Sequence, residues 1–368
     1  MIQMARPSKR KLIYVADNLF SSRKNTIKKI RPEQLDALNL FPKFHDLLKN
    51  KKINCITHMK DFDGIGSASI IENNYRNNIN KIFFTDYRKQ EIADLVKRTR
   101  NLTNSVIIIS DIGINRDSVP DILSMLRNFK KNNNIIIWLD HHEWDLAFAM
   151  EIAYNLDFLV CNENEINCAT NIVYTLLGKK TKKAEKFVHM VMLGDLHKQA
   201  KGITEKILQK TGYVISQICF QKNATKNLRT LVDYISNYNL NNNFINKFYK
   251  GYLEDANKNT LLLRKYMVEF AAKNKRFAVS FSKNLQSSFA GYFLLDKAEA
   301  DVSIFYNSST STVHLRGRGT ECASFAKYFH GGGHPFAAAF EYKKININSK
   351  KDRNNAVRAF KKAAEKIY

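Results

Sequence analysis

Short runs of β-forming residues alternate with amphipathic segments between residues 53 and 161, and this alternation restricts the fold more than any other feature. The runs predicted as strands are Ile53–Thr57, Lys81–Tyr87, Ser105–Ile112, Asn134–Asp140 and Asp157–Cys161. Between them, segments such as Gln90–Arg100 and Ser118–Lys131 repeat apolar residues three or four positions apart, which predicts helices. Strands that alternate with helices form a parallel sheet covered on both faces. We therefore expect an α/β fold.

The rest of the chain predicts two further regions. Residues 165–275 are expected to be mostly helical, without a convincing strand in their latter part. From Arg276 a second β-rich pattern begins, with strands expected at Phe277–Phe281, Asp301–Tyr306, Ser311–Arg316 and Ala337–Tyr342, and helices at Ala323–Phe329 and Asp352–Ile367. A chain of 368 residues exceeds what one core usually holds. We expect a first domain over residues 1–200 that begins with a basic N-terminal extension over about 1–45, a helical connector over 201–275, and a smaller α/β domain over 276–368.

A polar cluster follows the first predicted strand, at the edge where parallel folds bind ligands. Asp61 and Asp63 stand two positions apart, so in an extended backbone both carboxylates point to roughly the same side. Such a pair suits two adjacent hard cations. The glycines that follow let the chain turn into a helix whose first amides favour anions. A helix-capping turn rich in aspartate is the alternative interpretation of this segment.

Further carboxylates and two adjacent histidines end other predicted strands. Asp111 follows one apolar run, and Asp140, His141 and His142 end another. Because burial of an unpaired carboxylate is costly, these positions favour a site residue. One histidine can bind a metal while Asp140 fixes its tautomer. Asp195, near the end of a helix expected to be buried, is a further candidate, and oxygen ligands mixed with histidine favour manganese or magnesium over a thiolate-bound zinc.

A run of three glycines in the last part of the chain predicts phosphate binding. Gly331, Gly332 and Gly333 expose backbone amides for the close approach of an anion, and His334 can add a hydrogen bond. Arg316, on a neighbouring predicted strand, suits bidentate recognition of phosphate. A flexible loop is the alternative interpretation of the glycine run.

The composition is that of a soluble protein with a large excess of positive charge. The net charge is +25 and the pI is about 9.7, which favours a polyanionic partner such as nucleic acid. A genome bias toward lysine and asparagine is the alternative source of this charge. The five cysteines form no CxxC pair and are expected to be reduced. Because the sequence shows neither the apolar core of a signal sequence nor a run long enough to cross a membrane, we expect a cytoplasmic protein without membrane association.

Together these motifs resemble those of a known superfamily. Asp61-x-Asp63-Gly64, Asp111, Asp140-His141-His142 and Asp195 are similar, in order and spread, to the four motifs of the DHH phosphoesterase superfamily. The glycine run with His334 resembles the signature of the DHH-associated C-terminal domain. The first motif departs from the family pattern in one respect. His58 precedes Asp61 by three residues, against four in nanoRNase-like members and pyrophosphatases, and Met59 stands where RecJ enzymes often carry aspartate.

The resemblance implies a site for two divalent cations, manganese ahead of magnesium. The ligands that it implies are His58, Asp61, Asp63, Asp111, His141 and Asp195. The residues implied in catalysis are Asp111 as the bridging carboxylate, His141, and His142 facing the scissile phosphate, while Asp140 lies behind the ligands. Substrate contacts are expected from His142, Arg316, Arg318, Gly331, Gly332, Gly333 and His334.

The resemblance also implies a hydrolase that acts on phosphoester bonds. The leading hypothesis is a phosphodiesterase that cleaves single-stranded or short oligonucleotides, as a RecJ-like exonuclease or a nanoRNase does, by two-metal activation of water. The alternative is a phosphatase or phosphodiesterase of small substrates, namely phosphoadenosine phosphate, a cyclic dinucleotide or polyphosphate. An inactive replication scaffold is a third hypothesis, which the presence of all motif carboxylates disfavours. A homodimer and a replication or repair partner stay open.

Overall fold

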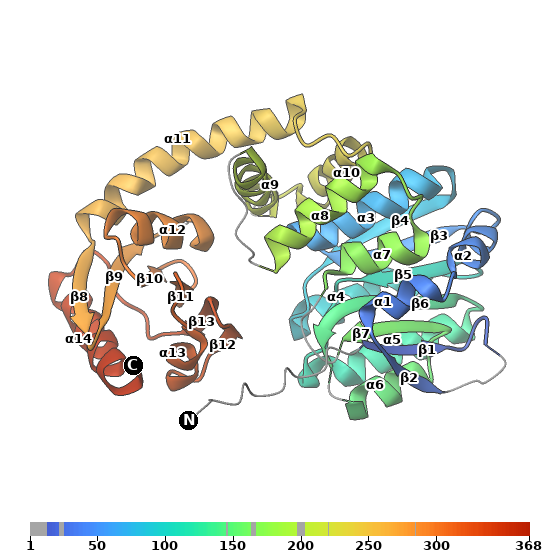
Figure 1. Ribbon diagram of the computed structural model, residues 1–368, viewed down its shortest axis with the longest axis horizontal. Helices are drawn as coiled ribbons and strands as arrows, with labels where there is room; N and C mark the ends of the chain where they lie inside the picture. Colours follow the sequence, from blue (N-terminus) through green and yellow to red (C-terminus); the bar gives the residue numbers. More distant parts are fainter. Residues whose placement is uncertain are drawn as a thin grey trace, which may run out of the picture. The chain divides into compact units, whose positions relative to one another are not determined.

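The computed structural model describes residues 13–21, 26–144, 146–162, 167–196, 203–219, 221–283 and 285–368. The chain divides into a first unit, Met1–Phe248, and a second unit, Tyr249–Tyr368, each with its own sheet (Figure 1). The division falls inside helix α11 (Asn243–Lys265), so α9 (Ile203–Cys219) and α10 (Ala224–Ile235) belong to the first unit. The regions predicted to begin at residues 201 and 276 stay predictions.

The first unit is built on a sheet that has seven strands in the described residues, in the order β2-β1-β7-β6-β5-β3-β4. The strands are β1 (Ile13–Asp17), β2 (Ile27–Ile30), β3 (Ile53–His58), β4 (Ile79–Thr85), β5 (Val106–Ser110), β6 (Ile135–Glu143) and β7 (Phe158–Asn162). From β4 to β7 all neighbouring strands are parallel, which confirms the predicted α/β fold. The expected N-terminal extension contributes an antiparallel edge, because β1 pairs with both β2 and β7.

Helices cover both faces of this sheet (Figure 1). On one face lie α4 (Lys89–Thr99), α5 (Val119–Lys131) and α6 (Leu146–Ala153), whose buried residues share a core with alternate residues of the strands. On the other face lie α2 (Phe41–Leu48), α3 (Phe62–Tyr75) and α7 (Ala169–Leu177). The short α1 (Pro32–Ala37) and the longer α8 (Lys182–Asp195) pack against α7. This cover explains why β5 is apolar on both faces.

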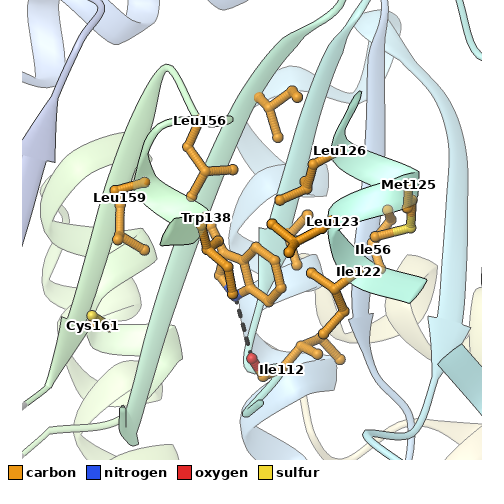
Figure 2. Packing of buried hydrophobic residues seen from close by; sticks show 14 of the residues in the cluster. Ile56, Ile112, Ile122, Leu123, Met125, Leu126, Trp138, Leu156, Leu159 and Cys161 are labelled. Carbon is orange, nitrogen blue, oxygen red and sulfur yellow. Dashed lines mark hydrogen bonds between the residues drawn. The ribbon is translucent and has the colours of Figure 1, made fainter. Parts of the chain in front are cut away.

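Trp138 on β6 anchors the core under α5. Figure 2 shows its ring among apolar side chains that include Ile122, Leu123 and Leu156, and full burial of such a side chain stabilises the fold by about 1.5–3 kcal/mol. Its indole Nε1 donates a hydrogen bond to the carbonyl oxygen of Ile112 at 3.3 Å. This bond ties the segment after β5 to β6, and therefore fixes the backbone next to Asp111.

The second unit contains a mixed sheet in the order β12-β13-β11-β10-β9-β8. Its strands are β8 (Val268–Ala272), β9 (Lys275–Ser282), β10 (Val302–Asn307), β11 (Thr312–Gly317), β12 (Gly332–His334) and β13 (Ala337–Glu341). Helices α13 (Ala323–Tyr328) and α14 (Lys350–Ile367) contribute to the core on one face, and α12 (Ser287–Lys297) to the core on the other. These elements confirm the smaller α/β domain.

We predicted no convincing strand in the latter part of residues 165–275, and this prediction was wrong. Val268–Ala272 forms β8, which pairs with β9 in an antiparallel hairpin. The residues of β8 are mostly exposed, so they lack a buried apolar face, and the backbone of β9 supplies the pairing that makes them a strand.

Among the described helices, none is both long and apolar enough to cross a membrane.

Candidate metal centre

The strand order of the first unit reverses between β3 and β5. The chain passes from β3 to β4 on one side and then crosses back to β5 on the other side of β3. Open α/β sheets bind ligands at the carboxyl ends of the strands beside such a reversal. His58 ends β3 and Asp111 directly follows β5, so the topology brings these two residues to this position.

One group of ligand atoms comes from His58, Asp61 and Asp111. The Nδ1 atom of His58 lies 2.6 Å from Oδ2 of Asp61 and 3.6 Å from Oδ2 of Asp111. Asp61 is the N-cap of α3, and its Oδ1 accepts a hydrogen bond from the amide of Gly64 at 3.0 Å. The three-residue spacing between His58 and Asp61 therefore suits a shared group of ligand atoms.

A second group comes from Asp63, His141 and Asp195. The Nε2 atom of His141 lies 3.6 Å from Oδ2 of Asp63, and its Nδ1 atom lies 3.6 Å from Oδ2 of Asp195. The Asp63 carboxylate also accepts hydrogen bonds at 2.7 Å from the amides of Ala169 and Thr170, at the start of α7. These bonds use helix amides that have no partner within the helix, and they fix the direction of the carboxylate.

The prediction that Asp61 and Asp63 point to the same side of an extended strand was wrong. The strand ends at His58, Asp61 caps α3, and Asp63 lies in the first turn of that helix. The two carboxylates therefore join different groups of ligand atoms.

Asp111 lies between the two groups. Its Oδ1 atom is 3.3 Å from Nε2 of His141, and its Oδ2 atom is 3.6 Å from Nδ1 of His58. Its backbone has φ of 56°, in the left-handed region that residues other than glycine seldom adopt. Aspartate tolerates this conformation better than most residues, and such strain is typical of functional sites. The geometry thus places one carboxylate between two histidines.

His142 belongs to a third group of ligand atoms, with Asp111 and His141. Its Nδ1 atom is 2.8 Å from Oδ1 of Asp140, whose Oδ2 accepts a hydrogen bond from Nε1 of Trp144 at 2.7 Å. The side chain of His142 is 34% exposed, whereas that of His141 is 5% exposed. Asp140 therefore orients the more accessible histidine, not the buried one.

The charges of this cluster shift several pKa values. Burial and the nearby Asp111 carboxylate raise the pKa of Asp63 to about 7, and burial together with Asp63 raises that of Asp195. Burial alone would lower the pKa of His141 and His142, but neighbouring carboxylates raise both, that of His142 to about 9. The carboxylates repel one another and attract positive charge.

Several buried atoms of the cluster have no hydrogen-bond partner among the described residues. Among them are Oδ2 of Asp111, Nδ1 of His141 and Oδ2 of Asp195. A buried polar atom without a partner costs about 1–3 kcal/mol. Divalent cations would satisfy these atoms and offset the repulsion between the carboxylates. The cluster of oxygen and imidazole donors is therefore compatible with divalent metal binding.

The structure adds Asp86, which the sequence patterns did not reveal as a site residue. Asp86 directly follows β4, is 2% exposed, and places Oδ1 3.6 Å from Nε2 of His58. Burial alone would raise its pKa, but the nearby His58 and Lys60 side chains hold the pKa below its ordinary value. The signal that marked Asp111, a carboxylate after an apolar run, is also present at Asp86, which follows the run Ile82–Phe84 and Thr85.

In the second unit, Arg316 and Arg318 have different surroundings. Arg316 on β11 donates from Nη2 to Oγ of Ser288 at 2.8 Å, and its buried Nε has no hydrogen-bond partner within the described part of the chain. Arg318, just beyond the strand, is exposed and forms an ion pair with Asp296. Arg316 therefore keeps a donor for an anion.

The glycine run of the second unit is partly a strand. Gly332, Gly333 and His334 pair with β13, and the amide of Gly331 donates to the carbonyl of Ala326 at 2.8 Å. A Cβ atom at Gly331 would lie 2.2 Å from the carbonyl oxygen of Ala339, so this position requires glycine. The expectation that the run exposes its amides therefore fails for Gly331, whose amide is already bonded.

Comparison with known proteins relates part of this chain to a known family. Residues 52–194 match the model of the DHH family, N-terminal domain. These residues therefore belong to the DHH superfamily. Members of this superfamily are generally hydrolases that act on phosphoester bonds. The matched DHH segment contains every residue of the metal cluster except Asp195, which directly follows it.

Solved structures share the fold of this DHH protein at low sequence identity. A DHH domain from a member of the s1p family of ribosomal proteins is 13% identical, with a TM-score of 0.58 over 92% of this chain and 93% of that chain. An exopolyphosphatase-related protein from Bacteroides fragilis is 17% identical, with a TM-score of 0.51 over 91% and 96%. RecJ from Thermus thermophilus in complex with Mn²⁺ is 14% identical, with a TM-score of 0.50 over 91% of this chain and 56% of RecJ. No curated protein matches the chain.

Proposed function

We propose that this DHH protein is a manganese- or magnesium-dependent phosphodiesterase that hydrolyses single-stranded or short oligonucleotides. The observation that carries the proposal is the position of Asp111, whose two carboxylate oxygens face histidines of two different groups of ligand atoms. A carboxylate in this position suits a bridge between two cations. The fold likeness to RecJ, solved with Mn²⁺, supports manganese as the first choice.

The ligands divide between the two cations by their groups. His58 and Asp61 would hold one cation, Asp63, His141 and Asp195 would hold the other, and Asp111 would contact both. Such a cation pair lowers the pKa of water and neutralises charge on phosphoryl oxygens. Four of these ligands, His58, Asp63, Asp111 and His141, are buried, which limits bulk water at the site and strengthens these electrostatic effects.

His142 is the chain's own group for contact with the reacting phosphate. Asp140 holds its Nδ1, so Nε2 is left to meet a substrate, and the side chain is accessible. Because Asp140 raises the pKa of His142 to about 9, the ring is protonated on both nitrogens near neutral pH. The Nε2–H of this imidazolium would bind a phosphoryl oxygen and stabilise the charge that develops in the transition state. Trp144 fixes Asp140 from the far side and so keeps the imidazole in place.

The choice of an oligonucleotide rests on charge and on the second unit. The net charge of +25 favours a polyanion, and Arg316 offers an unused donor. We propose that Arg316, Arg318, Gly332, Gly333 and His334 contribute substrate contacts. A cytoplasmic location, a homodimer and a replication or repair partner stay predictions.

A second candidate is hydrolysis of small substrates, namely phosphoadenosine phosphate, a cyclic dinucleotide or polyphosphate. The fold likeness to the exopolyphosphatase-related protein favours keeping it. An inactive scaffold is less well supported, because the four aspartates expected as metal ligands all lie in the groups of ligand atoms.

The test compares substrates of graded size. The protein is incubated with Mn²⁺ and end-labelled RNA or DNA of increasing length, beside phosphoadenosine phosphate, a cyclic dinucleotide and polyphosphate. We expect hydrolysis of oligonucleotides. Activity confined to the small substrates would support the second candidate instead.

The matched control is Asp111→Asn. Asparagine tolerates a left-handed backbone, so this variant keeps the fold while it removes the bridging charge. We expect hydrolysis to fall by at least about two to three orders of magnitude. Unchanged Mn²⁺-dependent hydrolysis in Asp111→Asn would refute the proposed enzymatic function of this site.

A further inference from the structure

Asp86 is a buried carboxylate outside the proposed set of cation ligands. Its Oδ2 atom pairs with Nζ of Lys60 and lies 2.8 Å from Nε of Arg88, and both of these basic side chains are exposed. Its Oδ1 atom accepts a hydrogen bond from the amide of Tyr87 at 2.8 Å. These contacts fix the carboxylate and offset the cost of its burial.

The two ring nitrogens of His58 face opposite environments. Nδ1 faces Asp61 and Asp111, at 2.6 and 3.6 Å. Nε2 is buried without a hydrogen-bond partner among the described residues, and Asp86 lies 3.6 Å from it. This separation is longer than a hydrogen bond, so a small rotation of the ring or one bridging water completes the contact. Ionised carboxylates only accept hydrogen bonds, so without a metal ion Nδ1 donates its proton to Asp61. When a cation takes the place of that proton on Nδ1, the remaining proton lies on Nε2 and faces Asp86.

The segment after β4 also restrains His58 through the ring face and the backbone. The ring of Tyr87 lies 5.6 Å from the imidazole, centroid to centroid, with an interplanar angle of 42°. The amide of Met59 donates to the carbonyl of Thr85 at 3.0 Å, which ties the residue after His58 to the end of β4. Three consecutive residues at the end of β4 therefore restrain His58. Thr85 bonds to the backbone of Met59, Asp86 lies at the edge of the ring, and Tyr87 lies beside the ring.

We propose that Asp86 is a positioning residue that fixes the tautomer and orientation of His58 for the cation shared with Asp61 and Asp111. The inference rests on the cation site of the proposed function and is independent of the substrate. Partners of this kind, which accept a hydrogen bond from the outer nitrogen of a metal-binding histidine, typically change metal affinity by about 10–100-fold. Asp86 also pairs with Lys60 and Arg88 and so offsets part of their positive charge beside this cation site.

The experiment measures Mn²⁺ binding by calorimetry without substrate. We expect the native protein to bind two Mn²⁺ ions, and Asp86→Ala to weaken one of them by about 10–100-fold while the other keeps its affinity. Asp86→Asn should weaken the same ion less, because its amide oxygen still accepts a hydrogen bond. Unchanged affinities in Asp86→Ala, or a native protein that binds no Mn²⁺, would overturn the inference.

A double variant separates positioning from a general effect on the fold. Because Asp86 acts through His58, adding Asp86→Ala to His58→Ala should cause no further loss of Mn²⁺ affinity. A second loss of the full size in the double variant would show that Asp86 acts independently, against the inference. The matched control is Glu91→Gln, which removes another carboxylate partner of Arg88, 3.2 Å from its Nη2, and should leave both affinities unchanged.

The imidazole nitrogen signals of His58 give a readout that does not depend on enzyme activity. In the native protein loaded with Mg²⁺, which is diamagnetic, we expect the cation on Nδ1 of His58 and the proton on Nε2. In Asp86→Asn at the same Mg²⁺ concentration we expect a larger fraction of rings with the proton on Nδ1. The same tautomer population in both proteins would contradict the role of Asp86. Native hydrolysis with no response of Mn²⁺ binding to Asp86 would refute this inference alone. The expected response of binding without any phosphoester hydrolysis would refute the proposed function alone.

Discussion

His314 on β11 is a histidine that the fold keeps neutral. Burial and the adjacent Arg316 guanidinium lower its pKa from 6.5 to about 4, and its ring stacks on Phe305. At pH values between about 4 and 6.5, His314 is protonated in the unfolded chain and neutral in the folded chain. The free energy of unfolding should therefore fall as the pH drops from about 6.5 to about 4, by about 2–3 kcal/mol in total.

Urea unfolding at about pH 7 and about pH 5 tests this prediction for His314. The variant His314→Gln has a side chain that does not titrate in this range, so its free energy of unfolding should fall less than that of the native protein. The same fall in both proteins would assign the pH dependence to other groups.

At the same scale, Asp111 shows what a single residue contributes beyond its charge. Its position after an apolar strand marked it in the sequence, but its left-handed backbone and its place between two histidines required the contacts of β5 with β6. Asp140 shows the converse. The sequence predicted that it would orient a histidine, and only the structure identifies that histidine as His142.

At the scale of elements, the turn from β3 into α3 depends on Gly64. A Cβ atom there would lie 2.3 Å from the carbonyl oxygen of His58, so any side chain would push the helix away from the strand. We expect Gly64→Ala to lower the free energy of unfolding by about 1–3 kcal/mol and to weaken Mn²⁺ binding, because Asp61 and Asp63 move with the helix.

Gly251 on α11 provides the control for Gly64. A Cβ atom at Gly251 would meet no atom within 4 Å, so Gly251→Ala should raise the free energy of unfolding by about 0.5–1 kcal/mol through helix propensity. Both variants can be compared by urea unfolding and Mn²⁺ calorimetry. Equal behaviour of the two would show that the turn tolerates a methyl group.

A buried ion pair joins α3 to α10. The Glu72 side chain is 1% exposed and lies 2.7 Å from Nη1 of Arg229 and 3.1 Å from Nε of Arg76. Removal of Arg229 leaves the buried charge of Glu72 with Arg76 as its remaining partner. Arg229→Ala should therefore lower the free energy of unfolding by about 2–3 kcal/mol, which is less than the loss expected when a fully buried pair is broken.

Replacement of both partners should be far milder. Glu72→Leu combined with Arg229→Met keeps the volume and removes the buried charge, and we expect a change of less than about 1 kcal/mol in urea unfolding. A double variant as unstable as Arg229→Ala would mean that the ion pair itself stabilises the contact between α3 and α10.

At the scale of the whole molecule, the positive charge makes a prediction about substrate length. If the net charge of +25 serves a polyanion, phosphate contacts release counterions, and binding weakens as salt rises. The KM of an oligonucleotide of about 20 nucleotides should therefore rise steeply with salt, with a log–log slope of about 0.7 per phosphate contact. The KM of a dinucleotide should rise much less.

Hydrolysis rates over a salt series, at saturating Mn²⁺, measure both slopes. Equal slopes for the two substrates would indicate that the charge reflects composition and not a track for nucleic acid. The kcat should change little in either case, because the ligands of the proposed metal site are mostly buried.

The sequence by itself determined the parallel strands of the first unit and the residues at their carboxyl ends. Apolar runs and helical periodicity are local signals, so β3 to β7 and the positions of His58, Asp111 and Asp140–His142 could be predicted from them. The tertiary structure decided which of these residues meet. It separated Asp61 from Asp63, paired β8 with β9, and brought Asp86 from β4 to His58. Such contacts join residues that are distant along the chain, or depend on the exact residue at which a strand ends. No local sequence pattern encodes them.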